Sequence, residues 1–111
     1  MAYDEARADR IRDLVAGEAG LTEMKMFGGI AFLIGGNMAV AASGQGGVMV
    51  RVDPAESESL VATTDARLVE MRGRQMQGWL RVDDEHVRTE GQLDKWVRLG
   101  TAYARSLPAK R

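Results

Sequence analysis

The sequence predicts an α+β domain of two layers, in which helices pack on one mostly antiparallel, five-stranded sheet. Three observations lead to this class. Short apolar segments between residues 24 and 83 alternate as strands do, and glycine pairs separate the first of them. A segment with helical spacing lies near each end of the chain. The expected order of elements is α-β-β-β-α-β-β-α.

Composition narrows the class of protein. The 111 residues suit one domain with its own core, so we expect residues 1–111 to form a single domain. The net charge of −1 gives no strong field that would attract nucleic acid or an anionic membrane. No apolar segment approaches the roughly 20 residues that span a bilayer. The start of the chain is acidic and polar, and cysteine is absent. We therefore expect a cytoplasmic protein with no membrane partner.

The first element is a helix over residues 3–16, because its apolar residues recur at helical spacing and charged residues fill the other positions. Asp4 is placed to cap its start, and Gly17 to end it. The apolar stripe consists of Ala8, Ile11, Leu14 and Val15.

Three strands are expected next, over residues 24–34, 38–43 and 48–52. The first is interrupted at Gly28-Gly29, which favours a break or bulge. The pair Gly35-Gly36 suits the chain reversal between the first two strands.

A short helix over residues 54–62 follows, since Asp53 is a capping residue and Pro54 suits a first helical turn. Residues 67–71 and 78–83 then have the pattern of two further strands, joined through Gly73 to Gln77.

The last helix has the clearest signals. Thr89 and Gln92 have the spacing of a capping box, and Pro108 prevents continuation at the other end. Gly100 falls on the apolar stripe, where it would let the helix approach the sheet closely. The stripe consists of Leu93, Trp96, Val97, Gly100, Tyr103, Ala104 and Leu107.

Residues that would carry chemistry are sparse. His86 is the single histidine and is expected in an exposed loop, and the acids at 83–85 suit a hydrated turn better than a cation site. The serines have no evident base, and the glycine pairs join strand to strand, whereas phosphate loops lead into a helix. We therefore expect no catalytic residue, no metal site and no cofactor.

Six methionines lie in or beside the expected strands. Two interpretations stay open: methionine fills irregular gaps in a core, and it also forms adaptable apolar contact surfaces. Trp79 lies beside Arg81 and opposite the apolar positions of its strand, so it is the better interface candidate of the two tryptophans.

Several segments resemble the TfoX/Sxy N-terminal domain family, in that family's order and over nearly the whole chain. They are Lys25-Met26-Phe27-Gly28-Gly29, Asn37-Met38-Ala39-Val40, Val50-Arg51-Val52, Gly73-Arg74-Gln75-Met76-Gln77-Gly78-Trp79, and Trp96-Val97 through Tyr103-Ala104-Arg105-Ser106-Leu107-Pro108. The resemblance implies an α+β fold related to that of secretion chaperones. It also implies kinship with regulators of natural competence, which act with the cyclic-AMP receptor protein. Their second, C-terminal domain has no counterpart here, so we expect a single-domain member, and no catalytic residue carries over.

Our leading hypothesis is a non-enzymatic domain of a small cytoplasmic bacterial protein that binds another protein, with a homodimer as one form of that interaction. Arginines offer directional hydrogen bonds to carboxylates, and a tryptophan offers a buried anchor. The candidate interface consists of Arg72, Arg74, Trp79 and Arg81, with Lys25 and Arg51 as secondary candidates.

Two alternatives remain. A nucleic-acid-linked transcriptional co-regulator is suggested by the family and by the basic segments 67–81 and 95–111, although the overall charge and the lack of a recognition helix argue against direct DNA binding. A small-molecule binder or an enzyme of unknown chemistry would use a pocket between the last helix and the sheet, lined by Lys25, Arg51 and Trp79.

Overall fold

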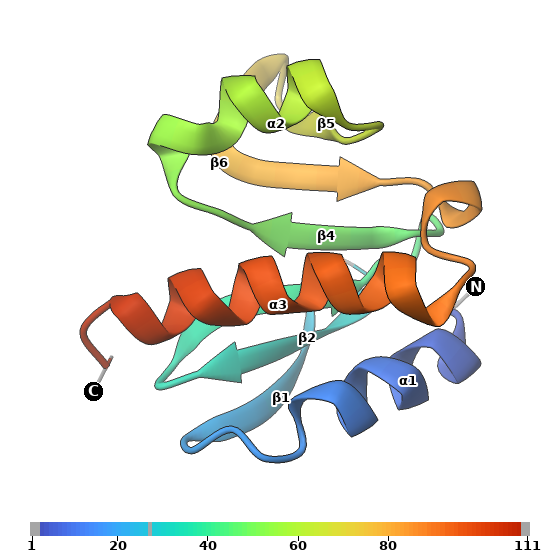
Figure 1. Ribbon diagram of the computed structural model, residues 1–111, viewed down its shortest axis with the longest axis vertical. Coiled ribbons are helices and arrows are strands. Elements are labelled where there is room, and N and C mark those ends of the chain that lie inside the picture. Colours follow the sequence, from blue (N-terminus) through green and yellow to red (C-terminus); the bar gives the residue numbers. More distant parts are fainter. Residues whose placement is uncertain (1–2, 27, 110–111) are drawn as a thin grey trace.

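The computed structural model of the protein describes residues 3–26 and 28–109, which form one sheet with helices packed on it (Figure 1). The elements are α1 (Glu5–Val15), β1 (Leu21–Met26), β2 (Gly29–Ile34), β3 (Asn37–Ala42), β4 (Val48–Arg51), η1 (Pro54–Glu56), α2 (Ser57–Thr63), β5 (Arg67–Met71), β6 (Arg74–Val82), η2 (Asp84–His86) and α3 (Glu90–Ser106), where η marks a 3₁₀ turn.

The sheet confirms the α+β class, but the described residues form six strands in it, in the order β1-β2-β3-β4-β6-β5, with every neighbouring pair antiparallel. The expected count of five strands was wrong because residues 24–34 are not one strand. The chain reverses between Met26 and Gly29, and β1 pairs with β2 along its full length. Gly28, at φ 76°, takes a left-handed conformation that suits this reversal. Phe27, inside the expected strand, lies outside the described residues.

The β5–β6 connection and the short helix after β4 also differ from expectation. The expected connection over residues 73–77 was wrong, because Arg72 (φ 54°) and Gly73 (φ 76°) alone reverse the chain and β6 begins at Arg74. The helix expected over residues 54–62 begins as η1 and continues as α2 to Thr63. Its capping residue was identified correctly: the Asp53 carboxylate accepts a hydrogen bond from the N–H of Ala55 at 2.9 Å.

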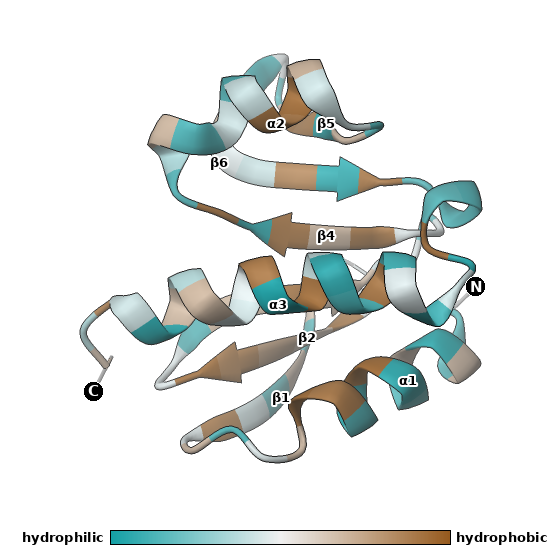
Figure 2. Ribbon diagram, in the orientation of Figure 1, coloured by the Kyte–Doolittle hydropathy of each residue, from teal (hydrophilic) through white to brown (hydrophobic). Residues whose placement is uncertain are grey.

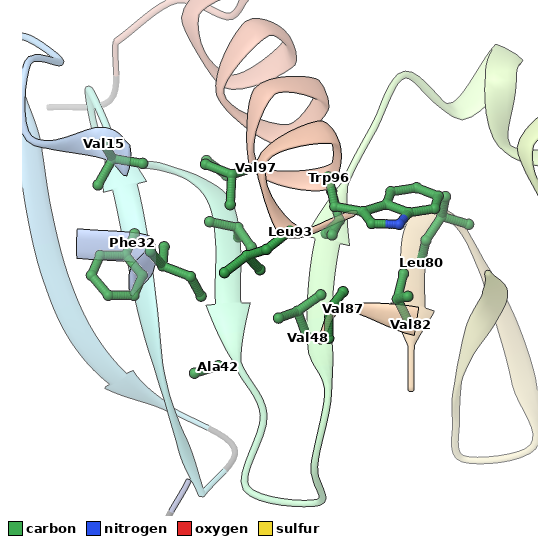
Figure 3. Close-up of a cluster of buried hydrophobic side chains, with 14 of the residues drawn as sticks. Val15, Phe32, Ala42, Val48, Leu80, Val82, Val87, Leu93, Trp96 and Val97 are labelled. Carbon is green, nitrogen blue, oxygen red and sulfur yellow. The ribbon is translucent and has the colours of Figure 1, made fainter. Parts of the chain in front are cut away.

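The α-helices of the described chain, α1, α2 and α3, cover one face of the sheet, which we call the helix face. α3 lies over β3 and β4, and α1 packs beside α3 (Figure 1). In Figure 3, Leu93, Trp96 and Val97 extend from α3 towards the buried side chains of the strands. Leu60 and Val61 of α2 pack against the same cluster, so a single core lies between the helices and the sheet.

The long helix α3 has the ends and the sheet contact that were expected. Thr89 Oγ1 accepts from the N–H of Gln92, and the Gln92 side chain accepts from the N–H of Thr89, both at 3.1 Å. A Cβ at Gly100 would lie 2.2 Å from the carbonyl oxygen of Ala39, which shows how closely this helix approaches β3.

A bidentate ion pair fixes α1 to the edge strand β1. The guanidinium of Arg12 donates to the two carboxylate oxygens of Glu23 at 2.7 and 2.9 Å. These hydrogen bonds lower the pKa of Glu23. Hydrophilic and hydrophobic residues alternate along α1 and α3, while hydrophobic residues run along the middle strands (Figure 2).

Candidate functional site

The face of the sheet opposite the described helices, which we call the outer face, carries a second apolar cluster. Its buried members are Ala31, Leu33, Met38, Ala41, Met49 and Val69, and Met26, Met71, Met76 and Trp79 pack partly buried against them. β2 and β3 are consequently buried on both faces. Met49 of β4 lies opposite the small Ala41 of β3, an arrangement that suits the flexible methionine side chain.

Five of the seven methionines therefore belong to the outer face. The packing interpretation is confirmed, because these side chains fill space between one another. Met26, Met71 and Met76 are only partly buried, and the second interpretation, an adaptable contact surface, stays a prediction. Met24 is 52% exposed and pairs with Ala31 of this cluster, so it extends the apolar face along β1.

A groove of about 750 Å³, which we call the outer groove, hollows the outer face and extends past the edge strand β5 to Val61 of α2. Met26 of β1 and Met71 of β5 both line it, although these strands form opposite edges of the sheet. Curvature of the sheet therefore brings the two edges towards one concave surface. Ala41, Met49 and Val69 also contribute apolar lining.

Arg81 places a cationic group in the outer groove. Its guanidinium donates to Ser43 Oγ at 3.2 Å and to the carbonyl oxygen of Gly46 at 3.1 Å, which hold the side chain in one orientation. Both acceptors are neutral. Among the described residues, no carboxylate lies within 4.0 Å of the Arg81 guanidinium. Its neighbour Arg67, directly opposite on β5, is instead bound to Asp83 at 2.6 Å.

Trp79 and Arg51 form a second contact near the outer face. They are register partners on β6 and β4, and the Arg51 guanidinium lies 5.1 Å from the centre of the Trp79 ring. It also lies 5.6 Å from the ring of Tyr103, so Arg51 joins the sheet to α3 through two cation–π contacts.

The structure brings together only part of the interface set predicted from the sequence. Arg72 occupies the β5–β6 turn, and Arg74 starts β6 opposite Met71 of the outer groove. Lys25 lies apart from them, because it pairs with Ile30, a residue of the core on the helix face.

The pocket suggested for Lys25, Arg51 and Trp79 does not form around these residues. β2 and β3 separate β1 from β4, a spacing of roughly 14 Å at about 4.8 Å between strands. Lys25 also lies on the other face from Trp79, so the three side chains share no site.

Asp84 holds the β3–β4 turn to the rest of the fold, so the acids at 83–85 do more than hydrate a turn. Its carboxylate accepts from the N–H of Gly47 at 2.8 Å and from the Arg7 guanidinium. The hydrogen bond from Gly47, helped by Arg7, holds the pKa of Asp84 below its ordinary value.

Replacing Asp84 with alanine is expected to lower the free energy of unfolding by about 1 kcal/mol at pH 7, a value reduced for solvent screening of a half-exposed carboxylate. Because the folded pKa is depressed, the contribution is complete above the unfolded pKa. It is lost as the pH falls through the folded pKa, from about pH 5 downwards. Urea unfolding across this range measures the difference, and Glu85→Ala is the matched control, expected within about 0.5 kcal/mol of wild type. An equal difference at every pH would contradict this role.

His86 is less exposed than the sequence suggested. It ends η2, its side chain is 31% exposed, and Nδ1 lies 3.4 Å from a carboxylate oxygen of Asp65. Over residues 3–26 and 28–109, no three histidine, aspartate or glutamate side chains gather where they could hold a metal ion.

Intramolecular pairs neutralise part of the basic segments. Arg98 is bound to Asp94 at 2.7 Å, and Arg105 lies 3.3 Å from Glu18. Lys110 and Arg111, at the end of the segment 95–111, lie outside the described residues. These pairs reduce the positive charge that α3 presents to a phosphate backbone.

The fold and the outer groove define an α+β domain with helices on one face of an antiparallel sheet and a concave apolar surface on the other. The TfoX N-terminal domain family matches residues 13–104, and the chain belongs to this family. It is thus a domain of the kind found in competence regulators. A search of curated proteins found no match. Among the described residues, no helix has the length and apolar character needed to cross a membrane.

Sequence reasoning missed the outer groove and most of its lining. Met26, Met49 and Met71 were noted as methionines, but their common location was not predicted. The signal was the position of Met49 opposite Ala41 and of Met76 opposite Val69, which becomes informative only when the strand register is known.

Proposed function

We propose that this protein is a non-enzymatic protein-interaction domain and that the outer face of its sheet is the docking surface. The main support is the division between the two faces. One face is sealed by helices over a continuous core, whereas the other presents methionines, a tryptophan and an oriented arginine around an open groove. Methionine-rich and aromatic surfaces are typical of sites that bind other proteins.

The family supports a protein-interaction domain, since competence regulators act on transcription together with a partner protein. The alternative of direct DNA contact is not supported, because Arg98 and Arg105 are already paired with acids. Cytoplasmic location and a role in transcription are parts of this proposal.

A pull-down from a lysate of the source bacterium tests the assignment. Trp79→Ala combined with Arg74→Glu is expected to lose partners that wild type captures, because it removes an anchor and reverses a charge beside the outer groove. Arg98→Glu, on the helix face, is the control and should keep them. Partner lists that are identical for all three proteins would contradict the proposal.

A further inference from the structure

We propose that the outer groove binds a short segment of a partner protein that presents large apolar side chains together with one carboxylate, and that Arg81 binds this carboxylate. This inference rests on the proposed function and specifies the chemistry of the partner.

Arg81 brings a positive charge into the outer groove. Its guanidinium is held by Ser43 Oγ and the Gly46 carbonyl, both neutral, and no carboxylate lies within 4.0 Å of it in the part of the chain that the structure describes. Arginine has five donors, and a carboxylate can accept two of them in parallel. The side chain is therefore oriented, partly buried and available to an external anion.

Apolar side chains line the groove beside Arg81. Met26, Met49 and Met71 lie in the groove that Arg81 borders, together with alanine and valine side chains. A ligand that satisfied Arg81 alone would leave this apolar lining in water. Apolar side chains flanking the carboxylate would cover it, and the unbranched methionines can adjust to their shapes.

The edge strand β5 borders the groove, and this position favours a polypeptide ligand over a small anion. Every residue of β5 borders the groove, although alternate side chains of a strand point to opposite faces. The groove therefore reaches the backbone of a strand that pairs with β6 alone among the strands that the structure describes. A polypeptide has both the length and the backbone groups to use such a border.

Selection from a phage-displayed library of random peptides, with the whole chain as bait, tests this chemistry. We expect the selected peptides to combine apolar residues with an aspartate or glutamate. For a synthesised selected peptide, changing that acid to its amide should weaken binding to wild type by about tenfold or more. The same change should have little effect on binding to Arg81→Gln, because the cation that distinguishes acid from amide is then absent.

Arg67→Gln is the matched control, since Arg67 borders the same groove but is already bound to Asp83. We expect it to bind the peptide within about threefold of wild type. Thermal unfolding checks that each variant is folded. If Arg81→Gln is not folded, the acid-to-amide comparison on wild type alone decides the question.

Selected peptides that lack an acid, an amide peptide that binds as well as the acid, or no enrichment at all would overturn the inference. Decanoate that binds the wild-type groove as tightly as the peptides would do so too, since it would point to a small amphiphile. The proposed function and this inference can fail separately. If a partner is lost on changing Trp79 and Arg74 but still binds Arg81→Gln, the outer face remains the docking surface, and only the proposed contact between Arg81 and a carboxylate is wrong.

Discussion

Leu93→Ala is expected to lower the free energy of unfolding by about 2–5 kcal/mol, the largest effect we predict. Leu93 is completely buried and extends from α3 into the core on the helix face (Figure 3). Truncation removes its buried methyl groups and leaves a cavity between α3 and the sheet, which close packing prevents from collapsing fully.

Leu14→Ala provides the matched control for this prediction. Leu14 lies on α1 and is 38% exposed, so the same truncation should cost less than about 1 kcal/mol. Urea unfolding monitored by circular dichroism, with an unchanged slope against denaturant, measures both values. Equal losses in the two variants would show that the helix face does not hold the main core.

Gly100→Ala is expected to destabilise the protein by about 2 kcal/mol, even though alanine is the better helix former. The new Cβ would lie 2.2 Å from the carbonyl oxygen of Ala39 and 3.2 Å from Cγ1 of Val50. Because the nearest obstacle is backbone, relief requires α3 to move away from β3, which disturbs the packing of Trp96 and Val97 as well.

Gly91→Ala tests whether helix propensity alone explains the result. Gly91 lies in the same helix, and nothing is within 4 Å of the position that its Cβ would take. This variant should be stabilised by a few tenths of a kcal/mol to about 1 kcal/mol. The two substitutions should thus shift the thermal midpoint in opposite directions, and a stabilised Gly100→Ala protein would refute the close approach of α3 to β3.

Helix ends could be predicted from the sequence because they depend on residues close together in the chain. Asp4, Asp53 and Thr89 each accept the backbone hydrogen bond that their capping role requires. The apolar stripe of α3 also depends on residues close together in the sequence. Trp96 and Val97 are buried, as their spacing predicted.

The β1–β2 hairpin was missed because the apolar pattern continues across it. Gly28 and Gly29 marked the position, but a bulge and a complete reversal have the same glycine signal. The missed hairpin also led to the wrong location for Lys25, which was grouped with the interface residues. Only the pairing of Lys25 with Ile30 reveals that it lies on the helix face, away from Trp79 and Arg81.

The outer groove could not be predicted because it depends on the register and curvature of the whole sheet. Met26 and Met71 are distant in the sequence and lie on opposite edge strands, yet they line one surface. The orientation of Arg81 depends likewise on the turn that supplies Ser43 and Gly46. The residue types indicated many methionines near the strands, but their common location on one face depends on the fold.

The most direct test of the docking surface is photo-crosslinking in living cells of the source organism. A photoreactive amino acid is placed at Gln45, which is exposed and borders the outer groove beside Arg81, or at Arg98 on the exposed side of α3. We predict protein adducts from position 45 and none from position 98. Adducts from position 98 alone, or from neither position, would contradict the assignment of the outer face as the surface that binds other proteins.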